Sequence, residues 1–258
     1  MLIQNDLNRL QDYCRARHLF LNFEKCHKIT FTRNRQPVQF QYTINNDLLH
    51  EVDNITDLGV LFDSKLLFDL HVEKIITNSN RMLGFIIRQG RLFEGNKTFL
   101  TLYYSLVYSR LNFASTIWNP QYNCYIDRLE QIQKRFLRFL AYKNNITVIN
   151  HDYLPLREAF GLVRLSDRRR IADVLLLFKI VNNMLSVPSI LERIPFRIPD
   201  LRLRNDSLFY TPYRRTNCSQ NSPLHRMMDC YMTFFVGENL FNTTFLSLKR
   251  LLKKGLSQ

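Results

Sequence analysis

The order of apolar and polar positions divides the chain into an N-terminal part of mixed periodicity and a longer helical remainder. Residues 4–17 repeat Leu7, Leu10 and Cys14 at the spacing of an amphipathic helix. Apolar and polar residues then alternate over short stretches, which is typical of half-buried strands. We therefore predict one helix followed by a small antiparallel sheet with strands at 28–32, 39–44, 48–52 and 58–62, and a hairpin turn at Asn45-Asn46.

The pattern becomes helical after Asp63, and three helices are predicted at 72–86, 97–118 and 125–141. The second is apolar nearly all round, which suits a helix buried among others, and it is expected to end at Asn119-Pro120. In the third, an apolar face leaves a separate polar side that carries Asp127, Gln131, Lys134, Arg135 and Arg138. We expect these helices to form an antiparallel bundle.

The last part of the chain alternates helical and irregular stretches. A linker at 144–166 holds a short helix at 156–160, and a long helix is predicted from Ser166 to about Met184. Prolines and arginines dominate 186–221, whereas two more helices are predicted at 222–235 and 244–254. The predicted fold class is α+β and mainly α: a small antiparallel sheet, a helical bundle and further C-terminal helices.

Charge is the strongest compositional signal. The chain has 36 Lys and Arg against 22 Asp and Glu, a net charge of +14, which favours polyanionic partners. Nine basic and three acidic residues lie between Lys134 and Arg170. A helix face of cations can follow a phosphate backbone without reading bases. The candidate phosphate contacts are therefore Lys134, Arg135, Arg138, Arg168, Arg169 and Arg170, and the alternative is an ordinary solvated surface or a charge-capped helix end.

Several short segments carry a resemblance to a known family. They include Asn22-Phe23-Glu24-Lys25 followed by Leu58-Gly59, and then the helical segments at 67–72, 81–86 and 131–138, with weaker likeness at 154–185 and 215–226. In order and spacing they resemble the region that follows the catalytic aspartates in reverse transcriptases of non-LTR retrotransposons, of the jockey-like kind found in invertebrates. Asp57 and Tyr13 depart from the aromatic and tryptophan residues usual in that family.

The resemblance implies a layout and a set of functional residues. The layout is a palm remnant at 1–65, a thumb-like bundle at 66–143 and a basic C-terminal helical region at 144–258. In the family, the thumb holds the primer–template, the Leu-Gly pair belongs to the primer grip, and the lysine lies beside the leaving pyrophosphate. Lys25, Leu58 and Gly59 therefore join the candidate nucleic-acid-binding residues.

The same resemblance implies that this chain is not a polymerase by itself. Polymerases of this kind hold two magnesium ions on carboxylates that include an adjacent Asp-Asp pair. No two acidic residues are adjacent anywhere in the chain, which is expected to begin after that pair. We therefore expect a non-catalytic remnant that binds no cofactor, although the intact parent enzyme would use magnesium.

The expected partner is the RNA or DNA backbone, bound without sequence preference, and no membrane partner is expected because no long uncharged apolar run occurs. Five scattered cysteines argue against a disulfide framework and favour the cytosol or nucleus. Cys218, His225 and Cys230 lack the CxxC pair of a zinc site, so no metal is expected. The oligomeric state is left open.

Two other functions stay open on the sequence alone. The chain could be a domesticated helical module that binds a protein and has no nucleic-acid role. It could also be an enzyme fragment that complements a separately encoded palm. Salt-sensitive binding of RNA or DNA separates the remnant from the protein-binding module.

Overall fold

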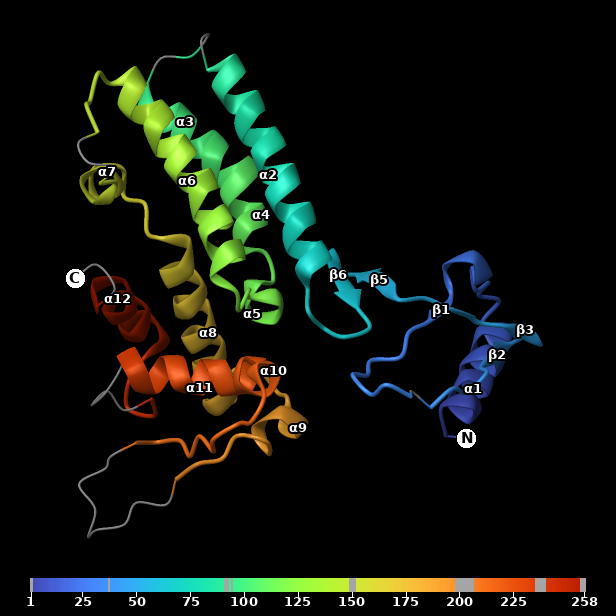
Figure 1. The fold of residues 1–258 in the computed structure, drawn as a ribbon. Helices are drawn as coiled ribbons and strands as arrows, with labels where there is room; N and C mark the ends of the chain where they lie inside the picture. The colour runs from blue at the N-terminus through green and yellow to red at the C-terminus, as the bar shows by residue number, and fades with distance from the viewer. Residues whose placement is uncertain are drawn as a thin grey trace. The chain divides into compact units, whose positions relative to one another are not determined.

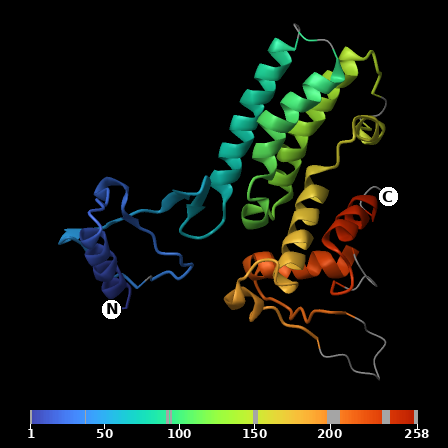
Figure 2. The same ribbon diagram turned by 180° about the vertical axis from the view of Figure 1, so that it is seen from behind.

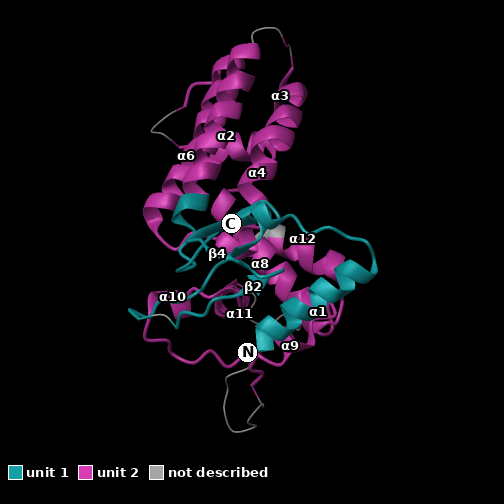
Figure 3. Cartoon of the chain, turned by 90° about the vertical axis from the view of Figure 1, so that its right-hand side faces the viewer, with its two compact units in different colours: residues 1–71 teal, residues 72–258 magenta. Residues whose placement is uncertain are grey.

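The computed structural model describes residues 2–36, 38–90, 93, 95–148, 152–197, 207–234 and 240–255. The protein is α+β and mainly α, as the sequence predicted. It divides into two compact units, residues 1–71 and residues 72–258, which Figure 3 shows in different colours.

Unit 1 contains one helix and short strands. Helix α1 (Leu2–Ala16) is followed by a 3-10 turn (Phe23–Lys25) and by strands that pair two at a time. The strands are β1 (His27–Lys28), β2 (Thr43–Ile44), β3 (Asp47–Leu48), β4 (His50–Glu51), β5 (Asn54–Asp57) and β6 (Val60–Asp63).

The strand pairing corrects the predicted antiparallel sheet. β2–β3 and β5–β6 are antiparallel hairpins, whereas β1 and β4 pair in parallel. The predicted Asn45-Asn46 turn is confirmed, since both residues have positive φ (51° and 69°) in the hairpin between β2 and β3. Leu58 was predicted inside a strand, but Leu58 (φ 45°) and Gly59 (φ 86°) form the turn between β5 and β6. β5 was not predicted because its residues do not alternate in polarity.

Unit 2 begins with a helical bundle. Helix α2 (Asp69–Gln89), which starts at the end of unit 1, is followed by α3 (Asn96–Tyr103), a π-helical turn (Tyr104–Tyr108) and α4 (Ser109–Asn112). A one-turn helix, α5 (Ser115–Trp118), then leads to α6 (Asn123–Lys143). In both Figure 1 and Figure 2, α2, the α3–α4 segment and α6 run side by side as an antiparallel bundle.

The predicted helix at 97–118 is interrupted near its end. Phe113 is extended and Ala114 adopts φ 50°, so the chain breaks between α4 and α5. The Trp118 indole nitrogen donates a hydrogen bond to the Phe113 carbonyl at 2.7 Å. This bond satisfies a carbonyl oxygen that lies at the break in the helix. A uniformly apolar pattern carries no signal for such a break, which explains the wrong prediction.

The bundle core follows the predicted faces. Leu83 of α2, Tyr103 of α3 and Phe136 of α6 are all completely buried. The Tyr103 and Phe136 rings stack with centroids 4.0 Å apart and planes 4° apart. The apolar face predicted for α6 is buried at Leu129, Ile132, Phe136, Leu137 and Leu140, and only Ile126 is half-buried.

The rest of unit 2 has a second apolar core around the long helix α8. The helices of this part are α7 (Leu154–Phe160), α8 (Leu165–Val181), α9 (Pro188–Leu191), α10 (Asn217–Gln220), α11 (Pro223–Phe234) and α12 (Phe245–Gly255). Side chains of α8, α11 and α12 pack together, among them Phe178, Met227 and Leu252. The predicted irregular segment at 186–221 holds only the short α9 and α10 and one bridge, Phe196 to Phe209, and residues 198–206 lie outside the described part.

Candidate nucleic-acid interface

Helix α6 positions the three leading cations on its side away from the core. Arg135 and Arg138 are exposed, whereas Lys134 is half-buried. The Lys134 ammonium and the Arg138 guanidinium each lie 6.0 Å from the ring centroid of Tyr153, a buried residue just before α7. This distance is at the outer limit of cation–π attraction, so Tyr153 attracts both cations only weakly. Of the three leading cations, Arg135 and Arg138 are the two that are exposed.

A fourth cation of α6 has a partner in the bundle. Arg128 pairs with Glu73 of α2 through both guanidinium Nη atoms, with Nη2 to Oε2 at 2.8 Å. The Arg128 guanidinium lowers the pKa of the Glu73 carboxyl below its ordinary value. Arg128 therefore ties α6 to α2 and is not a free charge for a ligand.

The three arginines of α8 have different environments, although they are consecutive. Arg168 is half-buried near Tyr108, whose pKa is raised by burial, a rise that the Arg168 charge opposes. Arg170 is exposed, lies 5.1 Å from the Phe234 ring and pairs with Asp167 at 3.2 Å. Burial raises the pKa of Asp167, and Arg170 opposes that rise.

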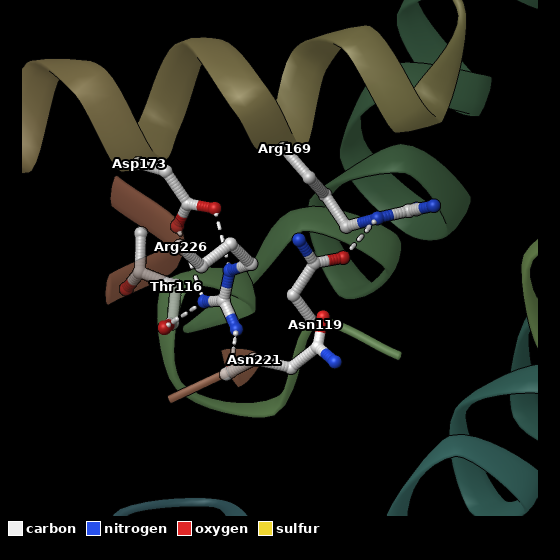
Figure 4. Close-up of polar contacts among 6 residues, drawn as sticks. All are labelled: Thr116, Asn119, Arg169, Asp173, Asn221 and Arg226. Atoms are coloured by element: carbon white, nitrogen blue, oxygen red, sulfur yellow. Dashed lines mark hydrogen bonds and ion pairs between the residues drawn. The ribbon is translucent and has the colours of Figure 1, made fainter. Parts of the chain in front are cut away.

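Arg169 corrects the predicted surface, because it is 1% exposed and cannot reach a nucleic acid from there. Its Nε donates a hydrogen bond to Asn119 Oδ1 at 2.9 Å, as Figure 4 shows. Among the described residues its Nη1 atom has no hydrogen-bond partner. Burial lowers the pKa of the guanidinium to about 10, and the nearby Glu130 carboxylate opposes that fall. Arg169 is therefore not a phosphate contact on the surface of this structure.

Figure 4 also draws a second group of polar contacts, around Arg226, that the sequence did not reveal. Arg226 of α11 pairs with Asp173 of α8 through Nε to Oδ2 at 2.8 Å and Nη2 to Oδ1 at 3.3 Å. It also donates to the carbonyl oxygens of Thr116, at 2.6 Å, and Asn221, at 3.2 Å. Burial raises the pKa of Asp173, and the hydrogen bond from Arg226 opposes the rise. This arginine therefore joins α11 to α8 and α5.

Two buried polar residues of α6 also have structural partners. Glu130 accepts a hydrogen bond from the backbone nitrogen of Ser166 at 2.8 Å, in the first turn of α8. Gln133 donates to the Val163 carbonyl at 3.0 Å. A carboxylate at a helix N-terminus satisfies a free N–H group and favours the helix dipole. Helix α6 thus presents one polar surface to solvent and uses other polar residues to dock α8.

The candidates in unit 1 are exposed but lie in a different electrostatic setting. Lys25 ends the 3-10 turn, and Leu58 is 87% exposed in the β5–β6 turn that also contains Gly59. Unit 1 has eight basic and nine acidic residues, a net charge of −1, so the remaining residues carry +15. The basic character of the chain is confined to unit 2, which favours the unit 2 candidates as the phosphate-binding surface.

Neither a metal centre nor a membrane-spanning helix occurs among the described residues. Within the described ranges, no three His, Cys, Asp or Glu side chains gather closely enough to hold a metal ion. His225 is buried in α11, while Cys218 and Cys230 are half-buried free cysteines in α10 and α11. The described helices include none with the length and apolar character needed to cross a membrane.

The predicted residues thus fall into four groups: three exposed cations (Arg135, Arg138 and Arg170), two half-buried cations (Lys134 and Arg168), the buried Arg169 and three exposed positions of unit 1. Comparisons of the chain with protein-family models, with curated proteins and with solved structures give no match.

Proposed function

We propose that this chain is the C-terminal part of a non-LTR retrotransposon reverse transcriptase, that it binds RNA or DNA backbones without sequence preference, and that it does not synthesise DNA. The family assignment is supported by the order and spacing of the sequence segments described above. The binding proposal is carried by one observation: Arg135 and Arg138 stand exposed on a rigid helix whose opposite face is buried. Location in the nucleus or cytosol belongs to the same proposal.

The structure narrows the expected phosphate contacts to a small group. Arg135 and Arg138 are exposed, and Lys134 shares the Tyr153 ring with Arg138. Because these cations lie outside the core, they can be replaced without opening a cavity. Phosphate contacts give affinity and a salt dependence but no direct base recognition.

The test is the salt dependence of binding to a duplex. Each lost phosphate contact reduces the slope of log K against log salt by about 0.9. We expect Arg135→Gln/Arg138→Gln to flatten the slope by about two units. When salt rises from about 50 to 200 mM, the fall in the variant's binding constant should therefore be about tenfold smaller than the fall for the parent chain. Fluorescence anisotropy over this salt range measures both quantities.

A matched control removes the same charge from another helix. Lys74 and Arg81 are exposed on α2 and are seven residues apart, so Lys74→Gln/Arg81→Gln changes the net charge by the same amount on one face. The control should weaken binding much less than the α6 pair. An α6 variant that stays folded and keeps the parent slope would refute the assignment of this surface.

Absence of polymerase activity is tested separately. The chain contains no adjacent pair of acidic residues, and such a pair is part of the magnesium site in the family. We therefore expect no primer extension on an RNA template with magnesium or manganese. Template-directed nucleotide incorporation above a control without protein would contradict this expectation.

Exposed apolar side chains in unit 1 favour a second candidate function, binding of a protein. Four of them are at least 83% exposed: Leu2, Phe20, Val38 and Leu58. Exposed apolar surface often marks a protein contact when it is contiguous. If the chain binds no nucleic acid, or binds it with no dependence on salt, protein binding becomes the better-supported function.

A further inference from the structure

The exposed cations of α6 share their side of the helix with one aromatic residue, Tyr142. Arg135, Arg138 and Tyr142 follow one another at spacings of three and four residues, so they lie on one side of the helix. Tyr142 is 81% exposed. A cationic stripe therefore ends in a tyrosine ring that is open to solvent.

The backbone around Tyr142 is held firmly. Asn96 and Asn144 exchange two side-chain hydrogen bonds of 2.9 and 2.8 Å, which join the end of α6 to the start of α3. The Ile146 nitrogen donates to the Ala141 carbonyl at 2.9 Å and Asn145 has φ 53°, which closes the helix end. Within the described ranges, the Tyr142 side chain makes no hydrogen bond or ring contact. The ring is thus presented from a fixed backbone.

Charge indicates what could cover this ring. Residues 131–148 contain four basic residues and no acidic residue. A polyanion is therefore favoured over a neutral or basic protein surface. Aromatic side chains stack on nucleic-acid bases, but a base inside a duplex already has both faces covered by its neighbours. Only an unpaired or terminal base can offer a free face to Tyr142.

We propose that the Tyr142 end of α6 binds an unpaired nucleotide beside a duplex, with its base stacked on the Tyr142 ring and neighbouring phosphates at Arg135 and Arg138. This inference rests on the proposed nucleic-acid binding and adds the class of substrate to it. The preferred ligand is then a junction between double and single strands, rather than a blunt duplex. Sequence preference stays slight because every base has a π face.

Three labelled probes test the proposal by fluorescence anisotropy with the full chain: a blunt duplex, the same duplex with a three-nucleotide overhang, and the duplex with an abasic overhang. The abasic probe keeps the phosphates and removes the bases. Stacking of one base changes Kd by about fivefold or more, so the parent chain should bind the overhang at least that much more tightly than the abasic overhang. Tyr142→Ala should abolish this difference, and Tyr142→Phe should keep it.

Tyr122, which is 50% exposed just before α6, provides the matched control. Tyr122→Ala should retain the preference for the overhang, and circular dichroism checks that both alanine variants are folded. Equal affinity of the parent chain for the normal and abasic overhangs would overturn the stacking proposal while leaving backbone binding intact. A Tyr142→Ala variant with unchanged preference would also overturn it. Failure of all three probes to bind in a salt-dependent way would instead refute the proposed function.

Discussion

Breaking the ion pair between Arg226 and Asp173 should destabilise unit 2 strongly. The Asp173 side chain is 0% exposed and that of Arg226 is 12% exposed. Arg226→Met removes two hydrogen bonds to this carboxylate and two to the Thr116 and Asn221 carbonyl oxygens. Removing one partner of a buried pair costs about 3–5 kcal/mol, because the other charge is left without compensation. For a unit of this size the melting temperature should fall by roughly 10 °C.

A double-mutant cycle separates the pair from its other contacts. Asp173→Asn keeps both hydrogen bonds from Arg226 to backbone carbonyls. Its loss of unfolding free energy should therefore be about 3 kcal/mol, the lower end of the range for breaking a buried pair. The double variant leaves no unpaired charge and should be at least about 2 kcal/mol more stable than the sum of the single effects predicts. Urea unfolding followed by circular dichroism gives the free energies.

The pH dependence of Arg226→Met gives an independent check. Burial raises the pKa of Asp173 and Arg226 opposes that rise, so loss of Arg226 should raise this pKa further. The folded variant then takes up a proton before the unfolded chain does, and its stability deficit should shrink as the pH falls from about 7 toward 4.

Arg170→Gln is the control on the same helix, because the Arg170 side chain is 45% exposed in its pair with Asp167. It should cost less than about 1 kcal/mol. Additive single effects, or a loss below about 1 kcal/mol for Arg226→Met, would refute the proposed role of the buried pair.

Other substitutions test the packing and ionisation of particular groups. Gly90→Ala should destabilise the bundle by about 1–3 kcal/mol in urea unfolding, since an added Cβ would lie 2.8 Å from atoms of both Phe99 and Phe139. Gly84→Ala in α2 is its control. It should stabilise the bundle by about 0.5–1 kcal/mol, because the new Cβ would meet only the Arg88 side chain, at an ordinary contact distance of 3.5 Å. Destabilisation by Gly84→Ala, or an unchanged stability of Gly90→Ala, would contradict the packing. Burial raises the pKa of Cys230 from 9.0 to about 11. The stability contributed by its protonated form is complete below pH 9 and declines toward pH 11, so Cys230→Ala should show a smaller fall in melting temperature over this interval than the parent chain. An equal fall in both proteins would argue against the shift.

Local periodicity in the sequence was sufficient to determine the main helices. α6, α11 and α12 begin and end within about two residues of their predicted limits, because side-chain spacing along a helix depends on nearby residues alone. The same pattern correctly separated the buried face of α6 from Arg135 and Arg138. Asn45-Asn46 likewise specified its hairpin through the preference of asparagine for positive φ.

Only the tertiary structure decided which charged residues are surface residues. Successive residues on a helix point about 100° apart, so of three consecutive arginines only Arg169 faces inward, where Asn119 from a distant segment receives its hydrogen bond. The burial of Glu130 and the pairing of Arg226 with Asp173 also depend on residues 36 and 53 positions away. The parallel pairing of β1 with β4 is non-local in the same way. Composition and periodicity do not encode such partners, because they arise when separate elements pack together.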